Sequence, residues 1–172
     1  MTDKQEAESQ EQRKQRQTRA LVHEAIGRGL NVRLQATGVS MFPYIWPREF
    51  VTFRPLGEGE VPQVGAVLIV DRGVGSRLVV HRLIGWNGET MVIRGDSNSE
   101  PDEPATLGNI LGQVTKIEGR ILHRERQVPA DGGVFWKILR RLAPASYCCN
   151  HTAVVVALGG WKIFRLFVKK KN

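Results

Sequence analysis

The chain has 172 residues, of which 41% are hydrophobic and 24% charged, and it carries a formal net charge of +8. This length suits one ordinary domain with appended segments, and the composition excludes a fibrous or wholly disordered chain. The charge is uneven, because residues 1–119 hold 14 basic and 15 acidic residues whereas residues 120–172 hold 11 basic and 2 acidic ones. The basic end suits an anionic membrane surface, nucleic acid or an acidic partner, and charge alone does not choose among them.

The two cysteines, Cys148 and Cys149, are adjacent in the chain. Neighbouring cysteines rarely form a strain-free disulfide, so we expect a fold without disulfides, compatible with a reducing compartment. One vicinal pair also makes no metal site, and we expect neither a metal nor a cofactor. Residues 1–17 lack an apolar core, so we expect a disordered polar leader there rather than a signal peptide or membrane anchor.

The first regular element is expected at residues 18–29. Its apolar residues have helical spacing, Thr18 suits an N-cap, and two glycines, Gly27 and Gly29, suit a stop. His23 lies in this helix, where an exposed or capping role is the simplest interpretation.

Beyond residue 30 the apolar residues alternate with polar ones, which is the period of a strand. Short strands are predicted at residues 32–37, 50–55, 65–71, 77–86, 90–96 and 110–123. The dipeptide Asn87-Gly88 predicts a hairpin turn between two of them. We therefore expect a mainly β, mostly antiparallel domain over residues 18–123, including the N-terminal helix.

Residues 124–172 are predicted to form a basic, partly amphipathic helical segment. Residues 134–142 fit a short amphipathic helix, and the stretch from Thr152 to Trp161 is uncharged but is soon interrupted by Lys162. A membrane span needs about 20 mostly apolar residues, so we favour an interfacial or domain-docking helix. A single short span is the alternative.

Three segments carry residue types that could act together: GVSMFP at 38–43, LVVHRLI at 78–84 and RGDSNSEPD at 94–102. A serine hydroxyl is a poor nucleophile unless a base removes its proton, and a histidine oriented by a carboxylate suits that task. Ser40 follows a glycine turn, His81 lies inside a predicted strand, and Asp96 and Asp102 lie in a polar loop. The set indicates a site in which a histidine and a carboxylate activate a serine nucleophile.

Each residue also has a simpler interpretation on its own. Ser40 could cap a turn, His81 could be a structural histidine, and Asp96 could make an Asx-turn. It is their joint occurrence that favours catalysis.

The three segments resemble the conserved boxes of type I signal peptidases, in the branch that includes endoplasmic-reticulum, archaeal and some sporulating-bacterial enzymes. The resemblance spans roughly residues 30–120. It implies a compact antiparallel β-barrel-like fold, shared with self-cleaving SOS-type repressors. It also implies Ser40 as nucleophile, His81 as general base and Asp102 as the residue that orients it, with Asp96 supporting the loop or sharing that role.

The commoner bacterial signal peptidases use a lysine as the base, but no lysine lies between Ser40 and Lys116. That variant is therefore excluded at the family position. We expect backbone N–H groups around Ser40 to bind the oxyanion, Gly38 to leave room for the substrate backbone, and Met41 to shape the pocket floor, although packing alone would also explain Met41.

One turn departs from the family, which usually has Pro-Gly-Asp after the serine box where this chain has Pro47-Arg48-Glu49. We therefore expect that turn to differ. The predicted function is a serine endopeptidase, cytoplasmic or peripherally membrane-bound, that cleaves an extended segment of a precursor protein or peptide. The alternatives are a non-catalytic peptide-binding module and a repressor-like regulator, and we do not expect nucleic-acid binding because residues 1–30 offer one helix only.

Overall fold

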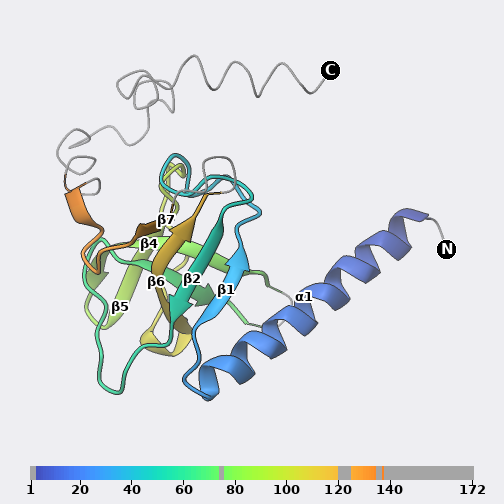
Figure 1. Ribbon diagram of the computed structural model, residues 1–172, viewed down its shortest axis with the longest axis horizontal. Helices are drawn as coiled ribbons and strands as arrows, with labels where there is room; N and C mark the ends of the chain where they lie inside the picture. Colours follow the sequence, from blue (N-terminus) through green and yellow to red (C-terminus); the bar gives the residue numbers. More distant parts are fainter. Residues whose placement is uncertain (1–2, 74–75, 120–124, 135–136, 138–172) are drawn as a thin grey trace, which may run out of the picture. The chain divides into compact units, whose positions relative to one another are not determined.

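In the part of the chain that the structure describes, helix α1 (Asp3–Gly27) precedes one antiparallel sheet of 7 strands (Figure 1). The computed structural model describes residues 3–73, 76–119, 125–134 and 137. The strands are β1 (Val32–Gln35), β2 (Phe50–Arg54), β3 (Val67–Asp71), β4 (Leu78–Asn87), β5 (Thr90–Arg94), β6 (Ile110–Glu118) and β7 (Glu125–Gln127). The prediction of a mainly β, antiparallel domain with an N-terminal helix is confirmed.

The sheet is open rather than closed. Its order is β1-β2-β6-β3-β4-β5, with β7 beside β6, so β1 and β5 are the two ends of the path and do not pair with each other. The sequence analysis expected a barrel-like fold, and the pairing of the described strands shows a sheet that is not closed into a barrel. Alternating apolar residues specify which face of a strand is buried, whereas closure depends on strand tilt and stagger, which alternation does not encode.

Helix α1 begins much earlier than predicted. Residues 3–17 are helical, so the prediction of a disordered leader over residues 1–17 is wrong for the described part. The segment is rich in Ala, Glu, Gln, Lys and Arg, and neither glycine nor proline occurs before Gly27. These are strong helix formers, and the absence of apolar residues concealed that propensity.

The predicted stop of α1 is confirmed. Gly29 adopts a left-handed conformation with φ 72°. Its N–H donates to the carbonyl of Ile26 at 2.8 Å, and the N–H of Leu30 donates to that of Ala25 at 3.0 Å. This is the Schellman arrangement, which satisfies the last helical carbonyls and favours glycine at the turning residue.

One apolar side chain and one carboxylate attach α1 to the sheet. Val22 is buried against the core. Asp71, at the end of β3, accepts hydrogen bonds from Arg19 Nε at 2.8 Å and His23 Nε2 at 2.6 Å. His23 therefore has a docking role. Burial pushes the pKa of Asp71 up, but the N–H of Gly73, His23 and Arg19 outweigh burial and hold that pKa below its ordinary value.

Strand β3 is buried on both faces, and its alternation builds two cores. Val67 and Ile69 join a first cluster with α1, the segment after β1 and strands β2 and β6. Leu68 and Val70 join a second cluster with β4, β5 and Ala105. Each fully buried aliphatic side chain contributes about 1.5–3 kcal/mol, so β3 is the centre of the fold.

The ends of the sheet differ in detail from the prediction. The hairpin between β4 and β5 is confirmed, but its turn residues are Gly88 and Glu89, because Asn87 pairs with Thr90. Strand β7 was not predicted, since it is short and charged, and it extends the sheet past the boundary expected at residue 123. The helix expected at 134–142 lies largely, and the apolar stretch at 152–161 wholly, outside the described residues. Within the described part of the chain, no helix combines the length and apolarity that a membrane crossing requires.

The turn at Pro47-Arg48-Glu49 keeps a conformation that glycine would favour. Arg48 has φ 72° and is the one non-glycine residue with positive φ among the described residues. Its N–H donates to the carbonyl of Ala36 at 2.7 Å, which closes the segment between β1 and β2. A left-handed conformation costs a residue with a Cβ about 1–2 kcal/mol, so this turn is strained.

We predict that Arg48→Gly stabilises the protein by about 0.5–1 kcal/mol, because relief of the left-handed strain exceeds the extra freedom of glycine in the unfolded chain. Chemical denaturation measures the change. Arg48→Ala is the matched control, since it removes the same side chain and keeps the strain. Equal stabilisation by both variants would contradict the prediction.

We predict that Asp71→Asn destabilises the protein by about 1–3 kcal/mol at neutral pH, because the buried, charged carboxylate is lost and its hydrogen bonds from Arg19, His23 and Gly73 are weakened or broken. The folded-state pKa of Asp71 is lowered, so its contribution is present above the unfolded pKa, about 4, and disappears as pH falls through the folded value. The stability difference between wild type and variant, measured by denaturation from pH 7 to pH 2, should therefore shrink below about pH 4. A difference that stays constant over this range would contradict the role given to Asp71.

Candidate active site

Ser40 lies in the segment between β1 and β2, residues 36–49, called here the serine loop. The loop is short of regular structure but is anchored, because Met41 and Ile45 are buried in the first core cluster. The N–H of Phe42 donates to the carbonyl of Val39 at 3.0 Å, and that of Ile45 to the carbonyl of Met41 at 2.8 Å. These two turns hold Ser40 at a fixed corner above the sheet.

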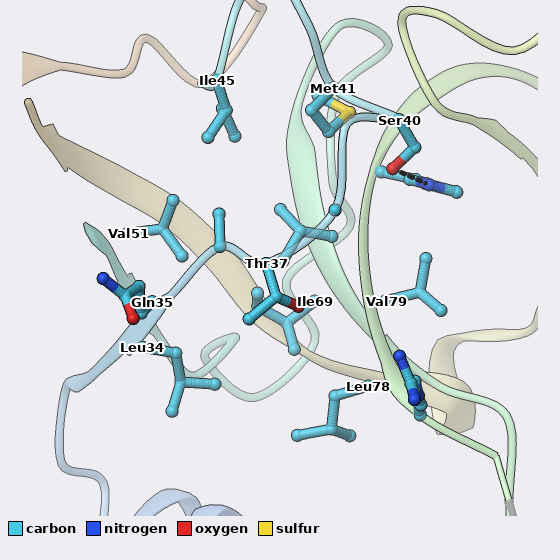
Figure 2. Close-up of a pocket in the computed structure, with 15 residues that line it drawn as sticks. Leu34, Gln35, Thr37, Ser40, Met41, Ile45, Val51, Ile69, Leu78 and Val79 are labelled. Carbon is cyan, nitrogen blue, oxygen red and sulfur yellow. Dashed lines mark hydrogen bonds between the residues drawn. The ribbon is translucent and has the colours of Figure 1, made fainter. Parts of the chain in front are cut away.

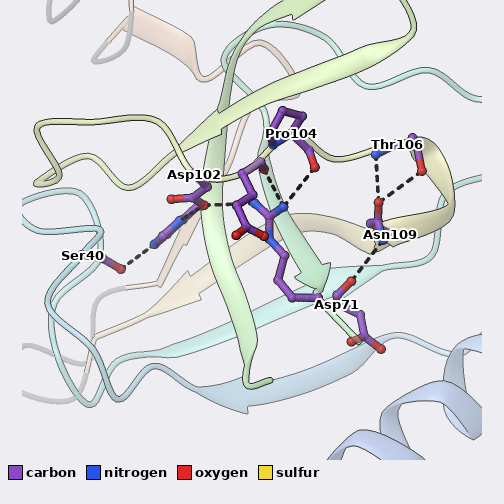
Figure 3. A network of polar contacts seen from close by, with 9 residues as sticks. Ser40, Asp71, Asp102, Pro104, Thr106 and Asn109 are labelled. Atoms are coloured by element: carbon purple, nitrogen blue, oxygen red, sulfur yellow. Dashed lines mark hydrogen bonds and ion pairs between the residues drawn. The ribbon is translucent and has the colours of Figure 1, made fainter. Parts of the chain in front are cut away.

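The side chains of Ser40, His81 and Asp102 form a continuous hydrogen-bonded chain, in which Ser40 and Asp102 lie on opposite sides of the histidine ring (Figure 3). Ser40 Oγ lies 2.8 Å from His81 Nε2. His81 Nδ1 lies 2.5 Å from Asp102 Oδ2. The Asp102 carboxylate can only accept a hydrogen bond, so His81 Nδ1 must carry the proton that it donates. Nε2 is then unprotonated and can accept the proton of the serine hydroxyl.

Asp102, and not Asp96, therefore orients the histidine. Both lie in the segment after β5, residues 95–104, called here the acidic loop. Both oxygens of Asp96 are taken by Arg82, whose Nε donates to Oδ1 at 2.8 Å and whose Nη2 donates to Oδ2 at 2.6 Å. Of the two roles predicted for Asp96, loop support fits this geometry and sharing the orienting role does not.

The Arg82–Asp96 ion pair is fully enclosed. The two side chains are 0% and 2% exposed. The third guanidinium nitrogen donates to the carbonyl of Gly65 at 2.8 Å, and the guanidinium lies 4.4 Å from the ring centroid of Tyr44. Burial raises the pKa of Tyr44, in spite of the neighbouring arginines, so the ring stays neutral. Removing either partner of such a pair would leave an uncompensated buried charge, at a cost of about 3–5 kcal/mol.

The acidic loop also forms hydrogen bonds directly with the serine loop. The N–H of Ser97 donates to the carbonyl of Ser40 at 2.8 Å, and Ser97 Oγ donates to the carbonyl of Val39 at 2.9 Å. A Cβ at Gly95 would lie 2.7 Å from the carbonyl oxygen of Ser40 and 3.0 Å from His81 Nε2. Only a glycine therefore lets the two loops approach closely enough for Ser40 to meet His81.

Gly38 opens the space beside the serine. A Cβ at Gly38 would lie 3.9 Å from Ser40 Oγ and 4.0 Å from the Ser40 backbone nitrogen, so the vacant volume adjoins both atoms. Among the described residues, the N–H groups of Ser40 and Met41 have no hydrogen-bond acceptor. They are available to an oxyanion formed next to Ser40 Oγ.

An apolar cavity of about 320 Å³ adjoins Ser40 and His81 (Figure 2). Its walls come from residues 34–38, at the end of β1, and from residues 77–81, in and just before β4. Ile45, Val51 and Ile69 also line it. Gly38 and Met41, which the sequence analysis assigned to the substrate site, both line this cavity.

Two unpaired strand edges flank the cavity. Strand β1 pairs with β2 alone among the described strands. In β4, residues 78–81 pair with β3, and the pairing with β5 begins only at Arg82. Each edge offers backbone N–H and carbonyl groups to an added strand, which is the arrangement that binds extended peptides.

Sequence reasoning missed two residues that complete the site. Arg82 lies among apolar residues in a predicted strand, so burial of its charge could have been expected. A buried arginine requires a carboxylate partner, and this requirement pointed to an ion pair with a residue such as Asp96. Gly95 lies in the motif RGDSNSEPD, but its role was not predicted, because that role arises from a contact between two loops that are distant in the chain. Within the described residues no group of His, Cys, Asp and Glu side chains is arranged to hold a metal ion.

Comparison of the chain with protein-family models, curated proteins and solved structures finds no significant match.

We predict that Gly95→Ala lowers the reactivity of Ser40 about 100-fold, because a displacement of about 1 Å between nucleophile and base has that effect. The added Cβ must push apart the Ser40 carbonyl and the His81 ring. The rate at which a fluorophosphonate probe labels Ser40 measures the loss.

The matched control is Gly85→Ala in β4, where an added Cβ meets nothing within 4 Å. That variant should label at the wild-type rate. Equal labelling of the Gly95 variant would show that the loop contact does not position Ser40.

Proposed function

We propose that the chain is a serine endopeptidase of the signal-peptidase type, which cuts an extended segment of a precursor protein or peptide. One observation carries the proposal. Ser40 Oγ lies 2.8 Å from His81 Nε2, and His81 Nδ1 lies 2.5 Å from Asp102 Oδ2, beside the apolar cavity. The proposal also assigns the sheet to the β fold of signal peptidases and self-cleaving repressors. Peripheral membrane contact is assigned to the basic residues 124–172.

In the proposed mechanism, Ser40 Oγ attacks the scissile carbonyl carbon while His81 Nε2 takes the hydroxyl proton. The carbonyl oxygen becomes an oxyanion in the space beside Gly38, where the N–H groups of Ser40 and Met41 can donate to it. His81 then gives the proton to the leaving amine, and the acyl group stays on Ser40. A water molecule, deprotonated by His81, hydrolyses this ester and restores the serine.

Asp102 supports the proton transfer without taking part in it. Its carboxylate fixes the proton of His81 on Nδ1 and stabilises the imidazolium that forms during attack. The side chains of His81 and Asp102 are 9% and 17% exposed, so this interaction is only weakly screened by water.

The groove favours an extended peptide with uncharged aliphatic side chains. Two strand edges can bind its backbone on either side, and the cavity between them is lined mainly by Leu, Val, Ile and Ala side chains. A helix or a folded hairpin has its backbone groups already paired, so it would gain little from these edges. The substrate must therefore present an unfolded or linker segment.

A lysine base has no place in this arrangement. Lys116 lies in β6 and is paired with Glu118 and Glu125, each at 2.9 Å. The alternative function, a binding module that holds a peptide without cutting it, would use the same groove. It would not require a serine in contact with a histidine that is itself oriented by a carboxylate.

We predict that wild-type protein is labelled at Ser40 by a fluorophosphonate and cleaves members of a library of unstructured peptides. Ser40→Ala and His81→Ala should each abolish cleavage and leave the fold intact. Asp102→Asn should lower the rate about 10⁴-fold, since it stabilises the wrong tautomer of the histidine. Mass spectrometry of the products measures cleavage, and circular dichroism checks the fold.

A second variant of the same loop is Asp96→Asn, which leaves Arg82 as a buried unpaired cation. It should destabilise the protein by about 3–5 kcal/mol, and it should lower cleavage by loosening the acidic loop rather than by changing the tautomer of the histidine. A wild-type protein that binds peptides but neither labels nor cleaves would establish the binding module instead.

A further inference from the structure

We propose that Arg72 is a positioning residue for Asp102, an inference that rests on the proposed peptidase function. Arg72 directly follows β3, and its guanidinium reaches the acidic loop. Nη1 donates to the carbonyl oxygens of Glu103 at 2.5 Å and Pro104 at 3.3 Å. Nη2 lies 3.4 Å from Asp102 Oδ2. One planar group thus holds the carboxylate and the two residues that follow it.

The contact with Asp102 is made at the oxygen that serves the histidine. Oδ2 accepts from His81 Nδ1 and also from Arg72 Nη2. The backbone of Asp102 is fixed separately, by its N–H bond to the carbonyl of Ile93 at 2.8 Å. That bond does not restrain rotation of the side chain, so Arg72 supplies the second point that orients the carboxylate. Partners that orient a functional side chain in this way commonly affect activity about 10- to 100-fold.

Arg72 is itself held by its neighbours along the chain, which makes it a firm support. The preceding residue, Asp71, is fixed to helix α1 by Arg19 and His23. Its backbone carbonyl accepts from Asn109 Nδ2 at 3.4 Å (Figure 3). The Arg72 side chain is 16% exposed, so most of its surface is shielded from water. A continuous set of contacts therefore runs from Asp71 and Arg72 to Asp102, His81 and Ser40.

The test compares full-length wild type with Arg72→Gln and Arg72→Lys. Arg72→Gln should label with fluorophosphonate about tenfold more slowly than wild type. The proton NMR signal of the hydrogen-bonded His81 Nδ1–H should broaden by faster exchange with water. Arg72→Lys keeps the charge but cannot hold two carbonyls and a carboxylate together, so it should fall between the other two. Asp102→Asn provides the reference for complete loss of the NMR signal.

The matched control is Arg54→Gln. Arg54 also binds a carbonyl, that of Pro55 at 3.1 Å, and a carboxylate, that of Glu60 at 2.7 Å, but outside the site. It should lose a similar amount of thermal stability and keep both the labelling rate and the NMR signal. If Arg72→Gln does not fold, Arg72→Lys decides the question by the same two measurements.

The outcomes separate this proposal from the function on which it rests. A folded Arg72 variant with the wild-type labelling rate and an unchanged NMR signal would overturn the role of Arg72 and leave the peptidase standing. A wild-type protein that shows the NMR signal but is not labelled at Ser40 by the fluorophosphonate would contradict the proposed peptidase function. The NMR comparison alone would then accept or reject Arg72 as the residue that orients Asp102.

Discussion

The buried ion pair between Arg82 and Asp96 is the interaction on which the site depends. Arg82 adjoins His81 in β4, and Asp96 adjoins Gly95 in the acidic loop, so the pair ties the loop to the strand beside the histidine. From that point the loop continues to Ser97, which donates a hydrogen bond to the serine loop, and to Asp102, which accepts one from the His81 ring. The pair itself has no contact with substrate in the proposed mechanism. The pair fixes the acidic loop, and this loop in turn holds the two residues that contact the His81 ring, Ser40 and Asp102.

The site divides its tasks between a rigid sheet and two anchored loops. The histidine stands on β4, which pairs with the doubly buried β3 and so has little freedom to move. Ser40, the proposed nucleophile, and the Asp102 carboxylate come from loops, where short segments can reach the ring from opposite sides. Because the pairing of β4 with β5 starts only at Arg82, the same strand also leaves an open edge beside the histidine. This unpaired edge serves the proposed function, because it leaves backbone groups beside the histidine to which a peptide can bind.

Much of this arrangement was predictable from the sequence, and the failures have physical causes. Alternation located six of the strands, and the Gly29 stop was read from local chemistry, because both signals lie within a few residues. The three motifs located Ser40, His81 and Asp102, but the choice between Asp96 and Asp102 required knowing which of them faces Arg82.

The length of helix α1 was underestimated because its first residues have a high helix propensity but no apolar face. Strand β7, the open sheet and the glycine contact at Gly95 depend on segments far apart in the chain, and no local pattern encodes them.

The two aspartates show how surroundings assign different roles to the same side chain. Asp96 is 2% exposed and both of its oxygens face one guanidinium, so its charge is already neutralised. Such a carboxylate has little left to offer an imidazolium. Asp102 is 17% exposed, and its contact with Arg72 is longer, at 3.4 Å, than its contact with His81. It therefore keeps negative charge directed at the ring, while Arg72 restrains it from turning away. A carboxylate suited to orient a base must be held firmly but not neutralised, and of the two only Asp102 meets both conditions.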